Sequence, residues 1–136
     1  MIVIDASLLL GQIRGEREAL AAVAAATTRT SLIAMHAPEL IELELLQALR
    51  RLLQIGVITA EQARTALANL AGLRLQRHAH APLRLSMWAL RDRLTAYDAS
   101  YVALAERLGA DLLLTADKGM AAVAREVLGA DRVRLV

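Results

Sequence analysis

A chain of 136 residues can form one domain with its own core, but it is too short for two comfortable domains. It contains no cysteine, no phenylalanine, one tryptophan and two tyrosines, which excludes disulfides, thiolate metal sites and a platform of several aromatic rings for stacking bases. Its 16 basic and 14 acidic residues leave a formal charge of +2, which by itself indicates no particular partner.

Strands and helices alternate along the chain. In chain order, we expect a strand at 2–4, a helix at 16–26, a strand at 31–36, helices at 38–55 and 59–71, a strand at 73–76, helices at 82–93 and 95–109, a strand at 111–115, a helix at 117–128 and a strand at 132–136. Gly56 and Gly109 are expected to end their helices, and Thr59 with Gln62 has the spacing of a capping box.

The clearest strand candidates are apolar throughout, which is typical of strands buried on both faces. Together with the intervening helices, they predict an α/β fold with a parallel sheet covered on both sides. No linker or repeat divides the chain, so we expect a single domain over residues 1–136. The N-terminal segment carries Asp5 inside its apolar run, which argues against a signal peptide, and no segment is long enough to span a membrane. These features predict a cytoplasmic protein.

Two aspartates follow predicted strands. Asp5 comes directly after the first strand, and Asp117 lies just beyond Thr115, which ends the 111–115 strand. In open α/β sheets, ligands bind outside the carboxyl ends of the strands, which favours a functional role. Each aspartate also precedes a helical segment, and helix capping is the better interpretation of either one alone.

Glu44 lies nearer the buried side of the 38–55 helix than Glu39 and Glu42 do. Its neighbours three and four positions away are Leu40, Ile41, Gln47 and Ala48. A carboxylate that is desolvated without a partner is costly or loses its charge, so either a cation or an arginine from elsewhere should lie beside it. Asp98 also has apolar helical neighbours, although its spacing from Thr95 fits a capping box, and alone that role is favoured.

Together, the four acids Asp5, Glu44, Asp98 and Asp117 indicate a metal site. Oxygen ligands suit Mg²⁺ or Mn²⁺, which keep several waters and bind through few carboxylates. The absence of cysteine and the dispersal of the histidines argue against zinc. Two of these histidines, His78 and His80, are expected on a polar surface segment.

Three segments resemble the motif blocks of the PIN-domain family: MIVIDASLLL, HAPELIELELLQALRRL and LTAYDASYVALAERLGADLLLTAD. The nearest resemblance is to VapC, the toxin half of type II toxin–antitoxin pairs, and it covers nearly the whole chain. It implies a PIN-like three-layer α/β/α sandwich with a central, mostly parallel sheet. It also implies a Mg²⁺-dependent endoribonuclease toxin that cleaves RNA, forms a homodimer and is neutralised by a cognate antitoxin.

The resemblance also assigns roles to individual residues. Asp5, Glu44 and Asp98 become the main metal ligands, and Asp117 completes a second metal position or orients the attacking water. Thr115 matches the small hydroxyl residue that accompanies the last acid. Five arginines are candidates for contact with the RNA backbone, although a solvated helix face is the preferred interpretation for at least half of them: Arg74, Arg77, Arg84, Arg91 and Arg93.

The helices expected over 38–71 carry more apolar residues than one core-facing stripe requires. These residues are Leu45, Leu46, Leu49, Leu52, Leu53, Ile55, Leu67 and Leu70. With the resemblance, they predict a groove between these helices that takes an apolar segment of the antitoxin, whereas burial of both helices in a small core is the alternative.

Other readings of the same residues stay open. Within the family, the chain could be a nuclease for RNA processing that is not a toxin, or a non-catalytic module that only binds a partner. A phosphatase of the haloacid dehalogenase type would need a second aspartate where Ser7 stands, so this class is discounted. A response-regulator receiver domain would need paired acids after the first strand, which are not visible.

Overall fold

The computed structural model describes residues 1–29 and 35–136, and these form a five-stranded sheet between two layers of helices. The strands are β1 Ile2–Ile4, β2 Met35–Pro38, β3 Leu75–His78, β4 Leu112–Thr115 and β5 Val133–Leu135. The helices are α1 Ala6–Ile13, α2 Arg17–Arg29, α3 Leu40–Gln54, α4 Ala60–Gly72, α5 Arg84–Ala89, α6 Ala96–Leu108 and α7 Lys118–Leu128, with short 3₁₀ turns at Ala81–Leu83 and Ala130–Arg132.

The sheet has the order β3-β2-β1-β4-β5, and every pairing between neighbours is parallel. The central strand β1 places Val3 opposite His36 of β2 on one side and Leu113 of β4 on the other. All three residues of β1 are buried, as expected for a strand covered on both faces. The predicted α/β class with a parallel sheet is therefore confirmed.

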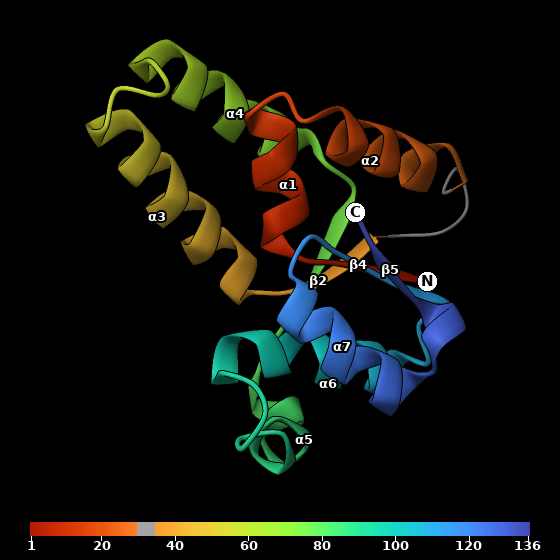
Figure 1. Ribbon diagram of the computed structural model, residues 1–136. Helices are drawn as coiled ribbons and strands as arrows, with labels where there is room; N and C mark the ends of the chain where they lie inside the picture. Colours follow the sequence, from red (N-terminus) through yellow and green to blue (C-terminus); the bar gives the residue numbers. More distant parts are fainter. Residues whose placement is uncertain (30–34) are drawn as a thin grey trace.

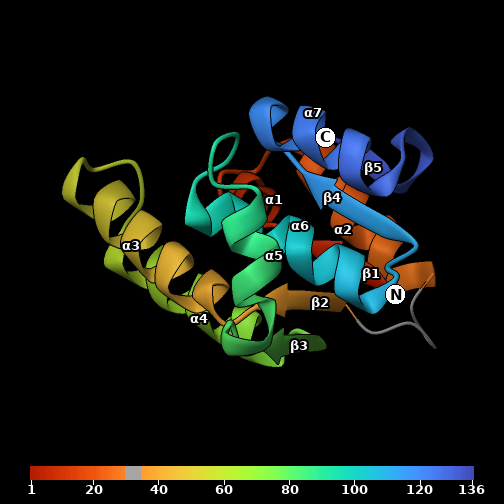
Figure 2. The same ribbon diagram turned by 90° about the horizontal axis from the view of Figure 1, so that it is seen from below.

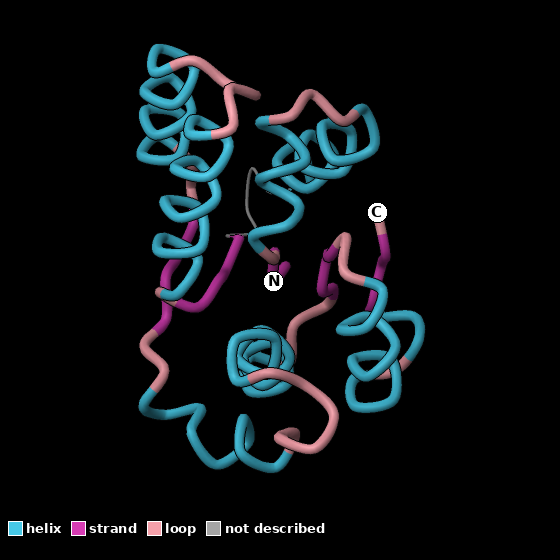
Figure 3. The backbone as a smooth tube through the Cα atoms, turned by 60° about the vertical axis from the view of Figure 1, so that its left-hand side comes forward, coloured by secondary structure: helices cyan, strands magenta, loops and turns pink. Residues whose placement is uncertain are grey.

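The helices cover both faces of the sheet, and the face that each helix covers depends on the direction in which the chain moves across the sheet. The chain steps from β1 to β2 to β3 in one direction, and then crosses back to β4 and β5 in the other. Because crossovers between parallel strands are right-handed, the two directions put their helices on opposite faces. In Figure 1, α1 to α4 lie above the sheet and α5 to α7 lie below it, and Figure 2 shows the lower layer from beneath. Figure 3 shows the strands in magenta between these layers.

Helix α6 forms the centre of the lower layer, and every residue from Ala99 to Ala105 is buried. It packs against β1 and β2, and α5 and α7 contact it from its two sides. Its small residues allow the backbone to lie close to the sheet. Thr95 caps its N-terminus, and Gly109 ends it with a φ of 58°, as the sequence predicts.

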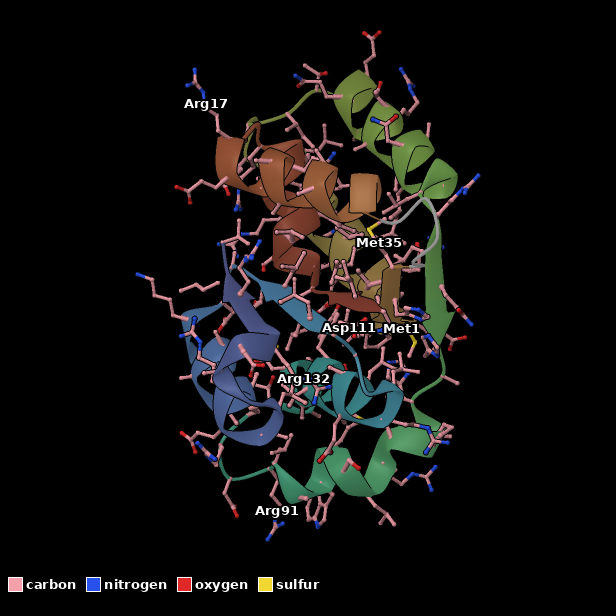
Figure 4. The ribbon with its side chains drawn as sticks, turned by 90° about the vertical axis from the view of Figure 1, so that its right-hand side faces the viewer. Met1, Arg17, Met35, Arg91, Asp111 and Arg132 are labelled. Carbon is pink, nitrogen blue, oxygen red and sulfur yellow. The ribbon has the colours of Figure 1, made fainter. Side chains whose placement is uncertain are left out.

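At the amino ends of the strands, two contacts tie β1, β4 and β5 together. The amino group of Met1 forms an ion pair with Asp111, and the Arg132 guanidinium donates to the Ala110 carbonyl at 2.6 Å. Figure 4 shows Met1 beside Asp111, with Arg132 on the adjoining segment. The carboxyl ends of the same strands are left for the acids described below.

Several predicted boundaries are wrong. The predicted helix at 82–93 is a 3₁₀ turn followed by the short α5, and the strand expected at 73–76 lies two residues later, at Leu75–His78. Most of the strand expected at 31–36 falls outside the described residues. A helical segment is expected after Asp5, but the bounds of α1 are not predicted, because a helix packed against α2, α3 and β4 needs no single apolar stripe. Among the described residues, none of the helices has the length and apolar character needed to cross a membrane.

His78 and His80 lie on a partly exposed segment at the edge strand β3, as expected, and both rings also form hydrogen bonds. His36 Nδ1 and His78 Nε2 are 2.9 Å apart and share a hydrogen bond between β2 and β3. His80 Nε2 accepts a hydrogen bond from the backbone N–H of Leu40 at 3.3 Å, at the start of α3. Burial lowers the pKa of His36 and of His78, and the neighbouring ring lowers that of His36 further. The three rings therefore contribute to the fold of this edge of the sheet.

Candidate active site

The candidate site lies at the carboxyl ends of β1 and β4. Between these two strands, the direction in which the chain moves across the sheet reverses. β1 and β4 are neighbours in the sheet, but the chain leaves β1 for α1 on one face and β4 for α7 on the other (Figure 1). The carboxyl ends of two such strands form a crevice in which α/β proteins bind their ligands. Asp5 follows β1 directly, and Thr115 is the last residue of β4.

Asp5 is held at this crevice by four hydrogen bonds. Its Oδ1 accepts the backbone N–H of Ser7 at 2.7 Å, which caps α1, and its Oδ2 accepts the Ser7 hydroxyl at 2.7 Å. Thr115 Oγ1 donates to the same Oδ2 at 2.5 Å, and the backbone N–H of Asp5 donates to the Leu114 carbonyl. Asp5 is only 6% exposed, and neutral donors from the helix α1 and the strand β4 fix the orientation of its carboxylate.

Asp117 is joined to this group through the loop after β4. Its backbone N–H donates to Thr115 Oγ1 at 2.9 Å, and its carboxylate accepts the N–H of Met120 at 2.7 Å, which caps α7. The N–H of Ala116 donates to the Ser7 hydroxyl at 2.9 Å. Asp5 and Asp117 are thus both helix caps and both members of the site, so the two interpretations of the sequence are compatible.

Glu44 extends from α3 toward α6, where the described side chain that contacts it is Tyr101 and not the arginine that was one of the two expected partners. The hydroxyl of Tyr101 donates to Glu44 Oε2 at 2.5 Å. Within the described part of the chain, Glu44 forms no ion pair, and the same is true of Asp5, Asp98 and Asp117. The described partner of this carboxylate is therefore a neutral hydroxyl and not a basic side chain.

Asp98 begins α6 and contacts Thr95 in a way that differs from a full capping box. Thr95 Oγ1 accepts the N–H of Asp98 at 3.2 Å, as predicted. The carboxylate of Asp98 accepts the Thr95 hydroxyl at 2.9 Å, whereas a capping box would have it accept the backbone N–H of Thr95. One carboxylate oxygen of Asp98 therefore has no partner within its own helix end.

The four acids influence one another electrostatically. Burial raises the pKa of Glu44, and the charges of Asp5 and Asp98 raise it further, against the lowering effect of the Tyr101 hydrogen bond. Burial likewise raises the pKa of Asp98, with added repulsion from Asp117 and Asp5. Acids contributed by β1, α3, α6 and the β4–α7 loop thus act as one negatively charged group.

Replacing Asp98 with Asn is expected to leave the melting temperature of the metal-free protein unchanged or to raise it. The substitution removes a charge that burial and its acidic neighbours penalise, and an amide oxygen can still accept the Thr95 hydroxyl. Folding raises the pKa of Asp98, so the charged carboxylate lowers the stability of the folded protein at neutral pH. This loss of stability disappears as the pH falls through the pKa of Asp98 in the folded protein.

The difference between Asp98→Asn and wild type should therefore shrink on acidification. Melting in EDTA across the pH range measures it, with Asp92→Asn as a control for an exposed acid. A marked loss of stability at neutral pH would mean that the charge of Asp98 is needed for the fold.

The donor set of the site fits a hard divalent cation better than any other metal. It consists of carboxylate and hydroxyl oxygens, and no basic side chain competes for them among the described residues. As the side chains stand, no three acids or histidines of the described chain converge closely enough to form a metal-binding group. Mg²⁺ does not need such a cage, because it keeps several waters and binds through one or two carboxylates.

Two site residues lie outside the sequence prediction, namely Ser7 and Tyr101. Ser7 stands two residues after Asp5, where a hydroxyl at the start of a helix can bond back to the cap, and this spacing is a usable signal. Tyr101 lies three residues after Asp98 and so on the same helix face, but only the tertiary contact between α3 and α6 reveals its bond to Glu44.

Three of the five arginines that were candidates for RNA contact have partners within the chain. Arg77 forms an ion pair with Glu42 at 2.5 Å, and Arg93 forms one with Glu126 at 2.8 Å. Arg91 lies over the ring of Trp88 at 5.1 Å and points away from the body of the protein in Figure 4. These three contacts do not decide between the solvated helix face that was preferred for at least half of the five arginines and contact with RNA.

Comparisons with known proteins identify the family of this chain. The family model described as the PIN domain matches residues 2–126. Ribonuclease VapC9 of Mycobacterium tuberculosis is 38% identical over 117 residues, which cover 86% of each chain, and Ribonuclease VapC3 of the same organism is 37% identical over 120 residues, which cover 88% of this chain and 85% of that one. Ribonuclease VapC1 is 44% identical over 88 residues, 64% of this chain and 65% of its own. The chain therefore belongs to the PIN-domain family and, within it, to the VapC ribonucleases.

Proposed function

We propose that this protein is an endoribonuclease of the VapC toxin type that hydrolyses RNA phosphodiester bonds with the help of Mg²⁺ or Mn²⁺. The observation that carries the proposal is the group of four acids around the carboxyl ends of β1 and β4, in which acidic neighbours raise the pKa of Glu44 and of Asp98 and no acid forms an ion pair among the described residues. Membership of a family whose relatives are named as ribonucleases supports RNA as the substrate.

In this proposal, Asp5, Glu44 and Asp98 would hold the metal, directly or through water, and Asp117 would complete the site. When bound, a divalent cation polarises the scissile phosphate and lowers the pKa of a water that attacks it. The hydrogen bonds from Ser7 and Thr115 keep the Asp5 carboxylate in one orientation. Since both donors are neutral, the site retains the negative charge that attracts the cation.

Metal dependence gives the direct test. Purified protein is expected to cleave single-stranded RNA when Mg²⁺ or Mn²⁺ is added and to lose this activity in excess EDTA, because the four acids alone would repel the phosphate. Restoration by added Mn²⁺ controls for denaturation by the chelator. Cleavage at an unchanged rate in EDTA would contradict the proposal.

The proposal includes an antitoxin as the partner protein, and the structure has a cavity where its apolar segment would bind. A cavity of about 460 Å³ lies between α1, α3 and α4. Its lining includes Leu9, Ile13, Leu45, Leu49, Ile58, Ala66, Leu70 and Leu73. The cavity touches α3 and α4, the two helices of the proposed groove, and α1 forms a third wall.

Other apolar residues assigned to this groove lie on a different face. Leu46, Leu53 and Ile55 are exposed and do not line the cavity, and Leu67 is exposed on α4. We propose that the antitoxin segment enters the lined cavity, where apolar contact is available on three sides. A homodimer is proposed from the family resemblance, and light scattering of the purified protein would measure it.

A further inference from the structure

Tyr101 connects the helices that carry the acids. It lies one turn beyond Asp98 on α6, is only 1% exposed, and donates its hydroxyl to Glu44 Oε2 on α3 at 2.5 Å. A backbone hydrogen bond from Ala6, the residue after Asp5, to the same hydroxyl favours the ionised phenol and lowers its pKa. Helix α1 therefore begins close to Tyr101. One phenol group therefore lies where the segments bearing Asp5, Glu44 and Asp98 meet.

The hydroxyl is also the single side-chain donor to Glu44 among the described residues, whose hydrogen bonds include no other to this carboxylate. Glu44 is half-buried, and burial is the largest cause of its raised pKa. Without the Tyr101 hydroxyl, the carboxylate would lose a partner that favours its charged form and would be free to change rotamer.

The chemical nature of this donor is informative. An arginine at the same place would satisfy Glu44 equally well, but its charge would compete with a metal ion for the carboxylate. A phenol stays neutral, and burial with the bond to Glu44 raises its pKa well above the ordinary value. It can therefore fix one oxygen of Glu44 while leaving the negative charge and the other oxygen available.

We propose that Tyr101 is a positioning residue, which holds the Glu44 carboxylate in the orientation that binds the divalent cation. The inference rests on the proposed metal-dependent function. It assigns Tyr101 a role that is distinct from filling the core, although its ring also packs there. Supporting partners of metal ligands commonly change metal affinity by about 10- to 100-fold when they are removed.

The test measures binding of Mn²⁺ alone to the RNA-free protein, by the electron paramagnetic resonance signal of the unbound ion. Tyr101→Phe, which keeps the ring, is expected to weaken Mn²⁺ binding by about 10- to 100-fold. Tyr97→Phe is the matched control, because Tyr97 is the other tyrosine and is 62% exposed. In a Glu44→Gln background, Tyr101→Phe should cause little further loss, since its effect passes through Glu44.

The outcomes separate the inference from the proposed function. If wild type and Tyr101→Phe bind Mn²⁺ equally well, the positioning role is wrong while the metal site stands. The same conclusion follows if Tyr101→Phe lowers Mn²⁺ affinity by the same factor in the wild-type and Glu44→Gln backgrounds. If wild type itself binds no Mn²⁺, the proposed function is wrong and the inference is overturned with it. Circular dichroism of Tyr101→Phe shows whether the fold is retained, and thermal melting compares the stability of Tyr101→Phe with that of Tyr97→Phe.

Discussion

Asp5→Asn is expected to lower the rate of RNA cleavage by about a thousand-fold or more while the protein stays folded. The substitution removes one negative charge from the proposed metal site, and losing such an interaction costs several kcal/mol of transition-state stabilisation, about 1.4 kcal/mol for each factor of ten. An amide oxygen can still accept the backbone N–H of Ser7, so the cap of α1 is preserved. The Ser7 and Thr115 hydroxyls can rotate to accept hydrogen bonds from the new NH₂ group.

Single-turnover cleavage of a labelled RNA measures this effect, with thermal melting as the check on folding. Asp92→Asn is the matched control, because it makes the same chemical change at a side chain that is 80% exposed. It should cleave at the wild-type rate. A folded Asp5→Asn protein that keeps wild-type activity would show that the reaction does not depend on the acid after β1.

Ala66→Glu is expected to weaken binding of the cognate antitoxin at least about tenfold, which corresponds to about 1.4 kcal/mol. Ala66 lines the cavity between α1, α3 and α4, and a carboxylate there would be desolvated by an apolar segment without gaining a partner. RNA cleavage by the antitoxin-free protein should be unchanged, because the cavity lining contains none of the four acids.

The chain offers a close control on the same helix. Ala68 is exposed on α4 and does not line the cavity, so Ala68→Glu should bind the antitoxin as wild type does. Affinities are measured by titration calorimetry with the purified antitoxin. If both variants bind normally and Leu46→Glu or Leu53→Glu does not, the antitoxin uses the exposed face of α3 instead.

The parts of the fold that the sequence predicts are those in which local pattern and tertiary environment agree. The apolar strand after Met1, the capped helix that begins at Thr95 and the glycine that ends it are all found as expected. Pro38 shows the opposite case, because it suits the first turn of a helix but belongs to β2, where it pairs with His78. At this position, pairing between β2 and β3 outweighs the local preference of proline for the first turn of a helix.

The acids of the site show a similar division. Position after a strand is visible in sequence and correctly brings Asp5 and Asp117 to neighbouring strand ends. The partner of Glu44 is not visible, because Tyr101 is 57 positions away and the contact exists only after α3 and α6 have packed on the sheet. Helical neighbours indicate that a carboxylate is partly buried, but they do not identify the group that faces it.

The hydrogen bond between Thr115 and Asp5 also has a consequence for the timing of biosynthesis. Its two residues are 110 positions apart, so the ribosome makes Asp5 on the order of ten seconds before Thr115 at ordinary rates of elongation. A nascent chain that ends before β4 lacks Thr115, Asp117 and the strand that orients Asp5. The acidic site is therefore assembled only at a late stage of synthesis, and a chain arrested before that point has Asp5, Glu44 and Asp98 but an incomplete site.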